Sequence, residues 1–401
     1  MKFKFANRML SLKASEIREI LKIAENPEII SFAGGLPAPE LFPIDAIKEA
    51  NRLVLEEDGQ NALQYSTTEG FTPLRQWISS RMNHNLGTSF DTENIIITHG
   101  SQQGLDLLGK IFLNEGDVVL CESPTYLAAI SAFRAYGCDF IEVPTDDDGM
   151  IISALEEILK TTKNIKLIYT IPTFQNPTGR TWSLERRKAI ADIANKYKTI
   201  VIEDNPYGEL RFKGDHLPSI KSFDNGGYVV CLGTFSKIFC PGYRIAWVAA
   251  HPEIINKLVI TKQSTDLQCN TLAQRDISKY LELNDIDNHI SKIREVYKRR
   301  CEITIKSMEE EFPGEVTFTR PEGGLFLWVT LPHNINARDV LVKCLERNVA
   351  FVPGGPFFPC GGNENYFRIN YSNMPKDRIV KGIKSLGEVL KEFSRTGHPQ
   401  G

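Results

Sequence analysis

The chain has 401 residues, with 47 lysines and arginines against 50 aspartates and glutamates, so its formal net charge is −3. This near balance gives no electrostatic reason to expect a nucleic acid or an anionic membrane as a partner. No apolar run approaches the roughly 20 residues that a helix needs to cross a bilayer. The length allows about two to three domains.

The N-terminal residues are basic, but they lead into a charged helix rather than into the apolar core of a signal peptide. We therefore predict a cytoplasmic protein. The eight cysteines form no C-x-x-C pair, and several lie in apolar runs. This pattern favours reduced thiols over disulfides or zinc ligands, and we expect no metal site.

Apolar runs of strand length alternate with longer amphipathic segments from about residue 95 to residue 250. This alternation is typical of an α/β domain with a largely parallel sheet. The predicted strands are residues 95–98, 118–121, 165–171, 199–203, 228–232 and 245–249.

Five of the predicted strands are followed by a side chain suited to bind a ligand: Ser101, Tyr126, Asn176, Asp204 and Lys237. Ligands of parallel α/β sheets gather beyond the carboxyl ends of the strands. The shared placement of these side chains therefore predicts one site at that edge of the sheet.

The sequence after the sheet is polar and amphipathic from about residue 272 to residue 312 and contains no proline, which predicts one long helix. This helix would lead into a smaller domain with its own strands. We expect those strands at residues 316–320, 324–329 and 366–370, with a helix near 337–348 and with Arg368 on the last strand.

Lys237 ends the segment Gly233-Thr234-Phe235-Ser236-Lys237, directly after an apolar run. A buried lysine is costly unless its amine is used, most often to form a Schiff base with an aldehyde cofactor. A solvated lysine in a turn is the ordinary alternative. Two other strand ends favour the cofactor, because one delivers Asp204 and another opens into Gln175-Asn176-Pro177-Thr178-Gly179.

These segments, in this order and over almost the whole chain, resemble the fold-type I, class I/II aminotransferases that depend on pyridoxal 5'-phosphate (PLP). The resemblance implies an α/β fold. A large domain, residues 46–285, would hold a mostly parallel seven-stranded sheet sandwiched by helices, and residues 286–401 would form a smaller α+β domain. Residues 1–45 would form a helix and arm that pack on the small domain.

The resemblance also assigns roles around the PLP ring. Lys237 would hold PLP covalently and then move the proton of the substrate's α-carbon. Asp204 would favour the protonated ring nitrogen, and Tyr126 would stack on the ring. Asn176 and Tyr207 would hydrogen-bond the phenolic oxygen.

The phosphate of PLP needs backbone N–H groups, hydroxyls and a cation. Ser101 and Gln102 lie where a strand opens into a helix, which directs the helix N-terminus at an anion. Ser236 adds a hydroxyl and Arg244 a guanidinium. Tyr65 matches the family tyrosine that reaches a phosphate in the partner subunit, which implies a homodimer with shared active sites.

Arg368, in Tyr366-Phe367-Arg368-Ile369-Asn370, matches the family arginine that binds the α-carboxylate of the substrate. An arginine on the surface of an edge strand is the alternative. The resemblance also places Asn176, Gly35 and Tyr65 at the substrate.

Two N-terminal segments, residues 15–20 and 31–43, resemble the 2-aminoadipate/kynurenine aminotransferase group. In that group an arginine and a serine on the N-terminal helix contact the far end of the substrate, and Arg18 and Ser15 match them. This would suit glutamate and 2-aminoadipate. The alternative is that Arg18 belongs to a solvated helix face.

We therefore predict a transaminase that moves the amino group of an L-amino acid to a 2-oxo acid such as 2-oxoglutarate by a ping-pong mechanism. The donors would be 2-aminoadipate and glutamate, with aromatic or branched-chain amino acids as further candidates. A carbon–sulfur lyase on the same fold is the nearest alternative, because a fold does not fix chemistry.

Two other functions are disfavoured. A regulator that senses ligands through an aminotransferase-like domain would need a DNA-binding module, and only about thirty residues, not strongly basic, precede residue 31. A nicotinamide enzyme is disfavoured because no G-x-G-x-x-G follows a predicted strand.

Overall fold

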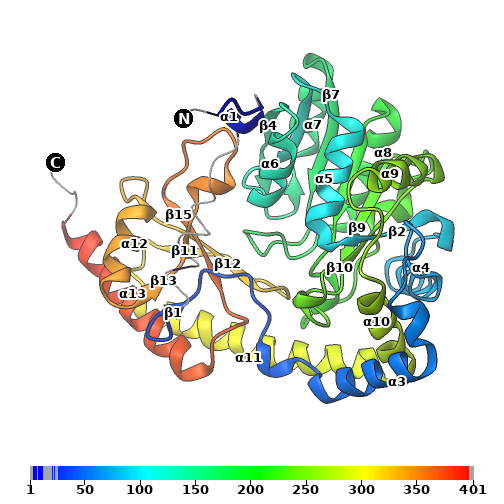
Figure 1. The fold of residues 1–401 in the computed structure, drawn as a ribbon. Coiled ribbons are helices and arrows are strands. Elements are labelled where there is room, and N and C mark those ends of the chain that lie inside the picture. The colour runs from blue at the N-terminus through cyan, green and yellow to red at the C-terminus, as the bar shows by residue number, and fades with distance from the viewer. Residues whose placement is uncertain (1–2, 7, 12–19, 21, 23–25, 397–401) are drawn as a thin grey trace.

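The computed structural model describes residues 3–6, 8–11, 20, 22 and 26–396 (Figure 1). A seven-stranded sheet and a four-stranded sheet form its two β-layers. The long helix α11 (Ile286–Glu311) runs between them along one side of the molecule. No helix among the described residues combines the length and apolar character needed to cross a bilayer.

The seven-stranded sheet is mostly parallel, as the alternating pattern predicts. Its order is β2-β10-β9-β8-β7-β3-β4, and only β10 runs antiparallel to its neighbours. All six predicted strands are present. The strands are β2 (Ile95–His99), β3 (Val118–Glu122), β4 (Asp139–Val143), β7 (Ile165–Thr170), β8 (Ile200–Asp204), β9 (Val229–Thr234) and β10 (Ile245–Ala249).

Helices pack on this sheet and on one another. Helix α5 (Gly100–Phe112) packs on β9 and β10, whereas α4 (Thr72–Leu86) packs against β2. The remaining helices of this part are α3 (Ile44–Ala62), α6 (Leu127–Arg134), α7 (Ile152–Thr161), α8 (Leu184–Tyr197), α9 (Pro252–Gln263) and α10 (Thr271–Leu283). The short strands β5 (Thr145–Asp146) and β6 (Gly149–Met150) form a hairpin.

The single helix predicted over residues 272–312 is wrong. The chain instead forms α10 and α11, which are separated by Asn284 and Asp285. Asn284 is extended, with φ of −131° and ψ of 149°. The Asp285 carboxylate accepts hydrogen bonds from the backbone N–H groups of Asp287 and Asn288, so it caps a new helix. The extended Asn284 and the capping Asp285 therefore divide the segment into two helices without a proline.

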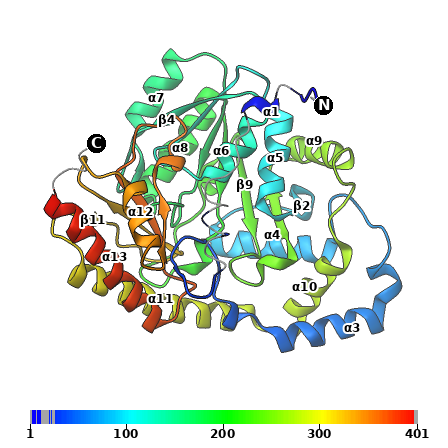
Figure 2. The same cartoon turned by 60° about the vertical axis from the view of Figure 1, so that its left-hand side comes forward.

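The four-stranded sheet is antiparallel, in the order β11-β12-β15-β14. Its strands are β11 (Thr317–Phe318), β12 (Phe326–Thr330), β14 (Val352–Pro353) and β15 (Tyr366–Asn370). Helix α12 (Ala337–Leu345) lies nearby, and α13 (Lys376–Thr396) packs along α11 (Figure 2). Arg368 pairs with Trp328 on β12, so it lies on an inner strand.

The N-terminal residues join the C-terminal part of the chain. Strand β1 (Ile30–Ser31) pairs in parallel with β13 (Val349–Ala350), and helix α1 (Arg8–Ser11) precedes it. The predicted domain limits at residues 45 and 285 stay predictions. The described residues also form six short 3-10 helices: η1 (Pro39–Leu41), η2 (Thr92–Asn94), η3 (Gly208–Leu210), η4 (Ile220–Phe223), η5 (Pro241–Tyr243) and η6 (Gly355–Phe357).

Candidate active site

The candidate site lies where the parallel strands β3, β7, β8 and β9 end, at one edge of the sheet. Asp204 is the last residue of β8, and Lys237 follows the end of β9. Asn176 lies in the loop after β7, and Tyr126 caps α6 after β3. The parallel register brings these side chains to the same edge.

The Lys237 amine is partly buried and donates a hydrogen bond to the carbonyl oxygen of Gly35 at 2.8 Å. It forms no ion pair with a carboxylate among the residues that the structure describes. Burial first, and then the positive charges of Arg368 and Arg244, lower the pKa of Lys237 to about 8. The amine therefore loses its proton, and becomes nucleophilic, at a lower pH than an ordinary lysine does.

Asp204 is buried with only one of its two oxygens satisfied. Its Oδ2 accepts a hydrogen bond from the Tyr169 hydroxyl at 2.8 Å, whereas Oδ1 has no partner among the described residues. Burial raises the pKa of Asp204 to about 7, against the opposing effect of the hydrogen bond from Tyr169. A buried oxygen without a donor is costly, so this position suits a ligand that offers one.

Arg368 begins a chain of buried hydrogen bonds. Its Nη1 donates to Asn176 Oδ1 at 2.7 Å, and Asn176 Nδ2 donates to the Tyr207 hydroxyl at 3.3 Å. A second nitrogen, Nη2, donates to the carbonyl oxygen of Ala33 at 2.7 Å. The guanidinium carbon lies 4.2 Å from the centre of the Phe326 ring.

The Arg368 guanidinium has capacity for a further acceptor. Its Nε is buried without a hydrogen-bond partner, and it forms no ion pair in the described part of the chain. Burial lowers the pKa of Arg368 to about 10. An incompletely paired buried guanidinium suits a carboxylate, which can accept two parallel hydrogen bonds.

The N-terminus of α5 lies beside Arg244. Gly100 has φ of +72°, and a Cβ added there would lie 2.1 Å from Arg244 Nη2, so only glycine allows this approach. The Ser101 hydroxyl is buried without a partner among the described residues. Ser236 is buried on the loop before Lys237, where its hydroxyl accepts a hydrogen bond from Thr234 at 2.9 Å. A helix N-terminus, a free hydroxyl and a guanidinium together suit a phosphate group.

Four other predicted residues are placed in different ways. Tyr126 is partly buried, and its pKa is raised by burial and next by the charge of Asp204, so the two side chains are neighbours. Gln102 is exposed and its amide donates to the carbonyl oxygen of Ala128. Tyr65 is 82% exposed. Gly35 contributes the carbonyl group that Lys237 contacts.

Ser15 and Arg18 lie outside the described residues, so their predicted contacts with the substrate stay predictions.

Three residues of the site were not singled out by the sequence. Tyr169 donates to Asp204, and Phe326 packs edge-on against Tyr207 with ring centres 5.7 Å apart. Gln175 donates to the carbonyl oxygen of Pro124 and accepts from Thr178, which holds the loop around Asn176. Only Gln175 carried a local signal, because it lies in the segment already noted.

Comparisons with known proteins agree over nearly the whole chain. The family model "Aminotransferase class I and II" matches residues 28–386. An aromatic-amino-acid aminotransferase of Thermococcus litoralis is 48% identical over 97% of this chain and 94% of its own length.

Two solved structures are also similar. A kynurenine aminotransferase of Pyrococcus horikoshii, in complex with PMP, has a TM-score of 0.93 at 45% identity, with 97% of both chains covered. An alpha-aminoadipate aminotransferase of Thermus thermophilus, complexed with N-(5'-phosphopyridoxyl)-L-leucine, has a TM-score of 0.91 at 41% identity, with 98% of both chains covered.

Proposed function

Because the chain belongs to the class I and II aminotransferases, which are PLP-dependent transaminases, we propose that it transfers the amino group of several kinds of L-amino acid to 2-oxoglutarate. The reaction would proceed by a ping-pong mechanism. The observation that carries this proposal is the buried Arg368 guanidinium. Its Nε has no hydrogen-bond acceptor among the described residues, and it lies in the same site as the amine of Lys237.

The unsatisfied polar atoms of the site support a specific arrangement of the cofactor. Asp204 Oδ1 would accept a hydrogen bond from the ring nitrogen, and Lys237 Nζ would hold PLP covalently. Ser101, Arg244 and the N-terminus of α5 would bind the phosphate. When bound, PLP supplies the electron sink that makes removal of the proton from the substrate's α-carbon possible.

The protein's own groups would then orient the substrate and move its proton. Arg368 would hold both oxygens of the α-carboxylate and so fix which bond of the α-carbon faces Lys237. Lys237 Nζ, with its pKa lowered to about 8, would take the proton from the α-carbon and deliver it to the carbon of the cofactor that carried the aldehyde. The Asn176 amide and the Tyr207 hydroxyl would hold the phenolic oxygen.

The apolar surroundings of Arg368 support acceptance of aromatic and branched-chain donors. The Phe357 ring centre lies 5.2 Å from the guanidinium carbon, and Trp328 packs edge-on against Phe357. A dicarboxylate donor needs a cation for its second carboxylate, and we assign that task to Arg18 with Ser15 beside it. The relatives named above act on aromatic, kynurenine and aminoadipate substrates, which supports a broad range.

The experiment is a half-reaction followed by visible absorbance. L-2-Aminoadipate, L-glutamate, L-leucine and L-phenylalanine are added separately to the PLP enzyme without a 2-oxo acid. Each true donor converts the absorbance of the lysine-bound cofactor into that of the pyridoxamine form. Arg18→Gln should slow the two dicarboxylates and spare leucine and phenylalanine, whereas equal losses for all four donors would refute the role of Arg18.

We further propose that two chains share their active sites as a homodimer. The loop with Tyr65 lies beside the loop with Gln268, because the backbone N–H of Ser66 donates to the Gln268 side chain. Leu63, Tyr65 and Leu267 are exposed on these loops by 71%, 82% and 56%. A cluster of exposed apolar side chains supports a subunit contact here.

Hybrid dimers test this sharing. Tyr65→Ala and Lys237→Ala subunits should each be impaired alone. A heterodimer of the two has one site with both an intact lysine and an intact partner tyrosine, so a random mixture should recover about a quarter of wild-type activity. No recovery on mixing would show that Tyr65 serves its own subunit.

A further inference from the structure

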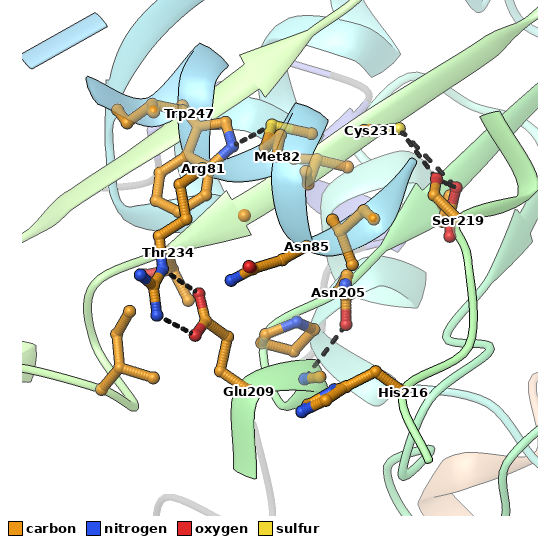
Figure 3. Close-up of a pocket in the computed structure, with 18 of the residues that line it drawn as sticks. Arg81, Met82, Asn85, Asn205, Glu209, His216, Ser219, Cys231, Thr234 and Trp247 are labelled. Atoms are coloured by element: carbon orange, nitrogen blue, oxygen red, sulfur yellow. Dashed lines mark hydrogen bonds and ion pairs between the residues drawn. The ribbon is translucent and has the colours of Figure 1, made fainter. Parts of the chain in front are cut away.

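A narrow cavity lies between helix α4 and the large sheet (Figure 3). Glu203 lines this cavity, whereas its neighbour Asp204 faces the active site, because successive side chains of a strand point to opposite faces. Helix α4 forms one wall and strands β9 and β10 form another, through Met82, Cys231 and Trp247.

The cavity is mostly apolar and small. Its volume is about 60 Å³. A water molecule needs roughly 10–15 Å³ by the same measure, so the cavity has room for a group of about four non-hydrogen atoms. This size fits a short branched aliphatic chain and excludes an aromatic ring.

The cavity opens into a wider hollow of about 610 Å³ between α4 and α11. Trp77, Arg81, Asn85 and His216 line both spaces, so the two are continuous. We call the place where they meet, lined by these four residues, the mouth of the cavity. A ligand can therefore place an apolar tail inside the cavity and a polar head group at the mouth.

The mouth has hydrogen-bond donors without acceptors. The Asn85 side-chain amide makes no hydrogen bond with any described residue, and Figure 3 shows it directed into the space near Glu209 and Asn205. Asn205 Oδ1 accepts from the backbone N–H of Gly208 at 3.1 Å, while its Nδ2 has no partner in the described part of the chain. A ligand head with acceptor atoms would satisfy both amides.

The mouth also holds a guanidinium with donors unused by the described residues, although the charges of Glu209 and Asp287 act on it. Arg81 is ion-paired with Glu209 at 2.5 Å and with Asp287 at 2.6 Å. Arg294 forms no ion pair among the residues described, and its Nε donates to the main-chain oxygen of Glu209 at 2.7 Å. Its Nη2 lies 3.4 Å from His216 Nε2.

Burial and the neighbouring arginines keep His216 neutral. Its pKa is lowered first by burial and then by Arg294, and Arg211 and Arg81 act in the same direction. Glu209 acts in the opposite direction. An anionic head group would therefore meet Arg294 and a neutral His216, while Glu209 and Asp287 remain paired with Arg81.

We propose that this cavity and its mouth form a second binding site, separate from the active site, for a short branched aliphatic carboxylate. The alkyl tail fills the space between Met82, Cys231 and Trp247, and the carboxylate binds Asn85 and Arg294 at the mouth. The turn from Asn205 to Gly208 forms a wall of this site and also carries Tyr207. The ligand therefore contacts the backbone that positions a residue of the active site.

The test measures binding of 4-methylpentanoate to the PLP enzyme by isothermal titration calorimetry. This probe has neither an amino group nor a 2-oxo group, so it cannot be transaminated. Arg368→Gln removes the carboxylate site of the active site and should leave binding at the second site unchanged. Asn85→Leu fills the mouth and should weaken binding about tenfold or more, with unchanged transaminase activity.

A matched pair of probes isolates the charge of the ligand. 4-Methylpentanamide has the same shape without the charge and should bind about tenfold more weakly to the wild type. Arg294→Gln should remove most of that preference. The proposal is overturned if the probe does not saturate the wild type, if Arg368→Gln abolishes binding, or if Asn85→Leu, shown to be folded by its melting temperature, binds as tightly as the wild type.

Discussion

Lys237 and Lys262 are both withdrawn from solvent, and their partners differ. Lys262, at the end of α9, is fully buried, and its amine donates to both oxygens of Asp266 at 2.8 and 2.9 Å and to Gln103 at 2.9 Å. Lys237 donates to the neutral carbonyl of Gly35. Its pKa falls to about 8 because burial disfavours the charged amine and no carboxylate among the described residues pairs with it to offset this effect. A buried lysine with a counter-ion supports the fold, whereas one without is prepared for chemistry.

The same contrast separates two neighbouring carboxylates on β8. Glu203 accepts hydrogen bonds from the Ser219 hydroxyl and from the backbone N–H groups of Ile220 and Lys221. Asp204 accepts one, from Tyr169, and its second oxygen has no donor among the described residues. The number of internal hydrogen bonds therefore distinguishes a structural carboxylate from one that faces a ligand site.

The largest effect is expected at the two lysines. Lys237→Ala should abolish transamination, because it removes the amine that we propose to attach the cofactor and to move the proton. Intact-mass measurement after borohydride reduction should find PLP covalently bound to the wild type and not to this variant. A retained adduct would show that another lysine is the attachment site.

Lys262→Met is the matched control for that variant. It leaves Asp266 without its buried counter-ion, so the melting temperature should fall. The borohydride adduct should remain, because the active-site lysine is intact. Loss of the adduct in this variant would remove the distinction between the two lysines.

The two carboxylates of β8 should separate activity from stability. Asp204→Asn should lower kcat by about a hundredfold or more, because it removes the charge that we propose to face the cofactor ring. Glu203→Gln should keep most of the activity and lose roughly 1–3 kcal/mol of unfolding free energy. The NH2 group of the glutamine would face hydrogen-bond donors that now point at a carboxylate oxygen, so those donors would lose their acceptor. Steady-state kinetics and urea unfolding of both variants measure the two effects. The reverse pattern would contradict the assignment.

The sequence predicted the features of this site that depend on short segments. Apolar runs marked all six of the predicted strands, and the polar residues that follow four of the parallel ones do lie at one edge of the sheet. The predicted family, transaminase activity and PLP dependence are confirmed, and the carbon–sulfur lyase alternative loses its support. Strand β4 was not predicted, because it lies at the edge of the sheet and only its last residue, Val143, is buried.

The sequence did not predict features that depend on long-range contacts. Tyr169 meets Asp204 because β7 and β8 are adjacent, and a single sequence does not determine strand order. The break between α10 and α11 depends on whether Asp285 caps a helix or continues one, and both fit an amphipathic pattern. The binding roles of the site residues stay predictions.

The pH dependence of stability should also distinguish the two kinds of buried charge. In the folded chain Lys237 releases its proton near pH 8, whereas in the unfolded chain it does so near its ordinary pKa of 10.5. Between these values the unfolded state binds more protons, so PLP-free protein should gain stability as the pH rises. Urea unfolding across this range should show the gain in the wild type and not in Lys237→Met.

Asp204 should act in the opposite direction at lower pH. The folded state keeps its proton to about pH 7, whereas the unfolded chain releases it near 3.8. The folded state binds more protons in between, so PLP-free protein should lose stability as the pH rises through that window. Asp204→Asn should flatten this part of the profile, and an unchanged profile would mean that Asp204 is ionised in the folded chain.

The smallest effect is expected at Tyr169, which acts only through Asp204. Tyr169→Phe removes the one internal donor to the Asp204 carboxylate, so the pKa of Asp204 should rise further and its charge beside the cofactor ring should weaken. The loss of one hydrogen bond predicts a decrease in kcat of about tenfold or less, with KM nearly unchanged, because Tyr169 is not among the residues assigned to the substrate. A purely structural role would lower the melting temperature without moving the pH profile. A shift of the acidic limb of the kcat profile to higher pH is therefore the decisive result. Tyr297→Phe provides the matched control, because it removes a buried hydroxyl that accepts a hydrogen bond from the backbone N–H of Ala38 and makes none with Asp204.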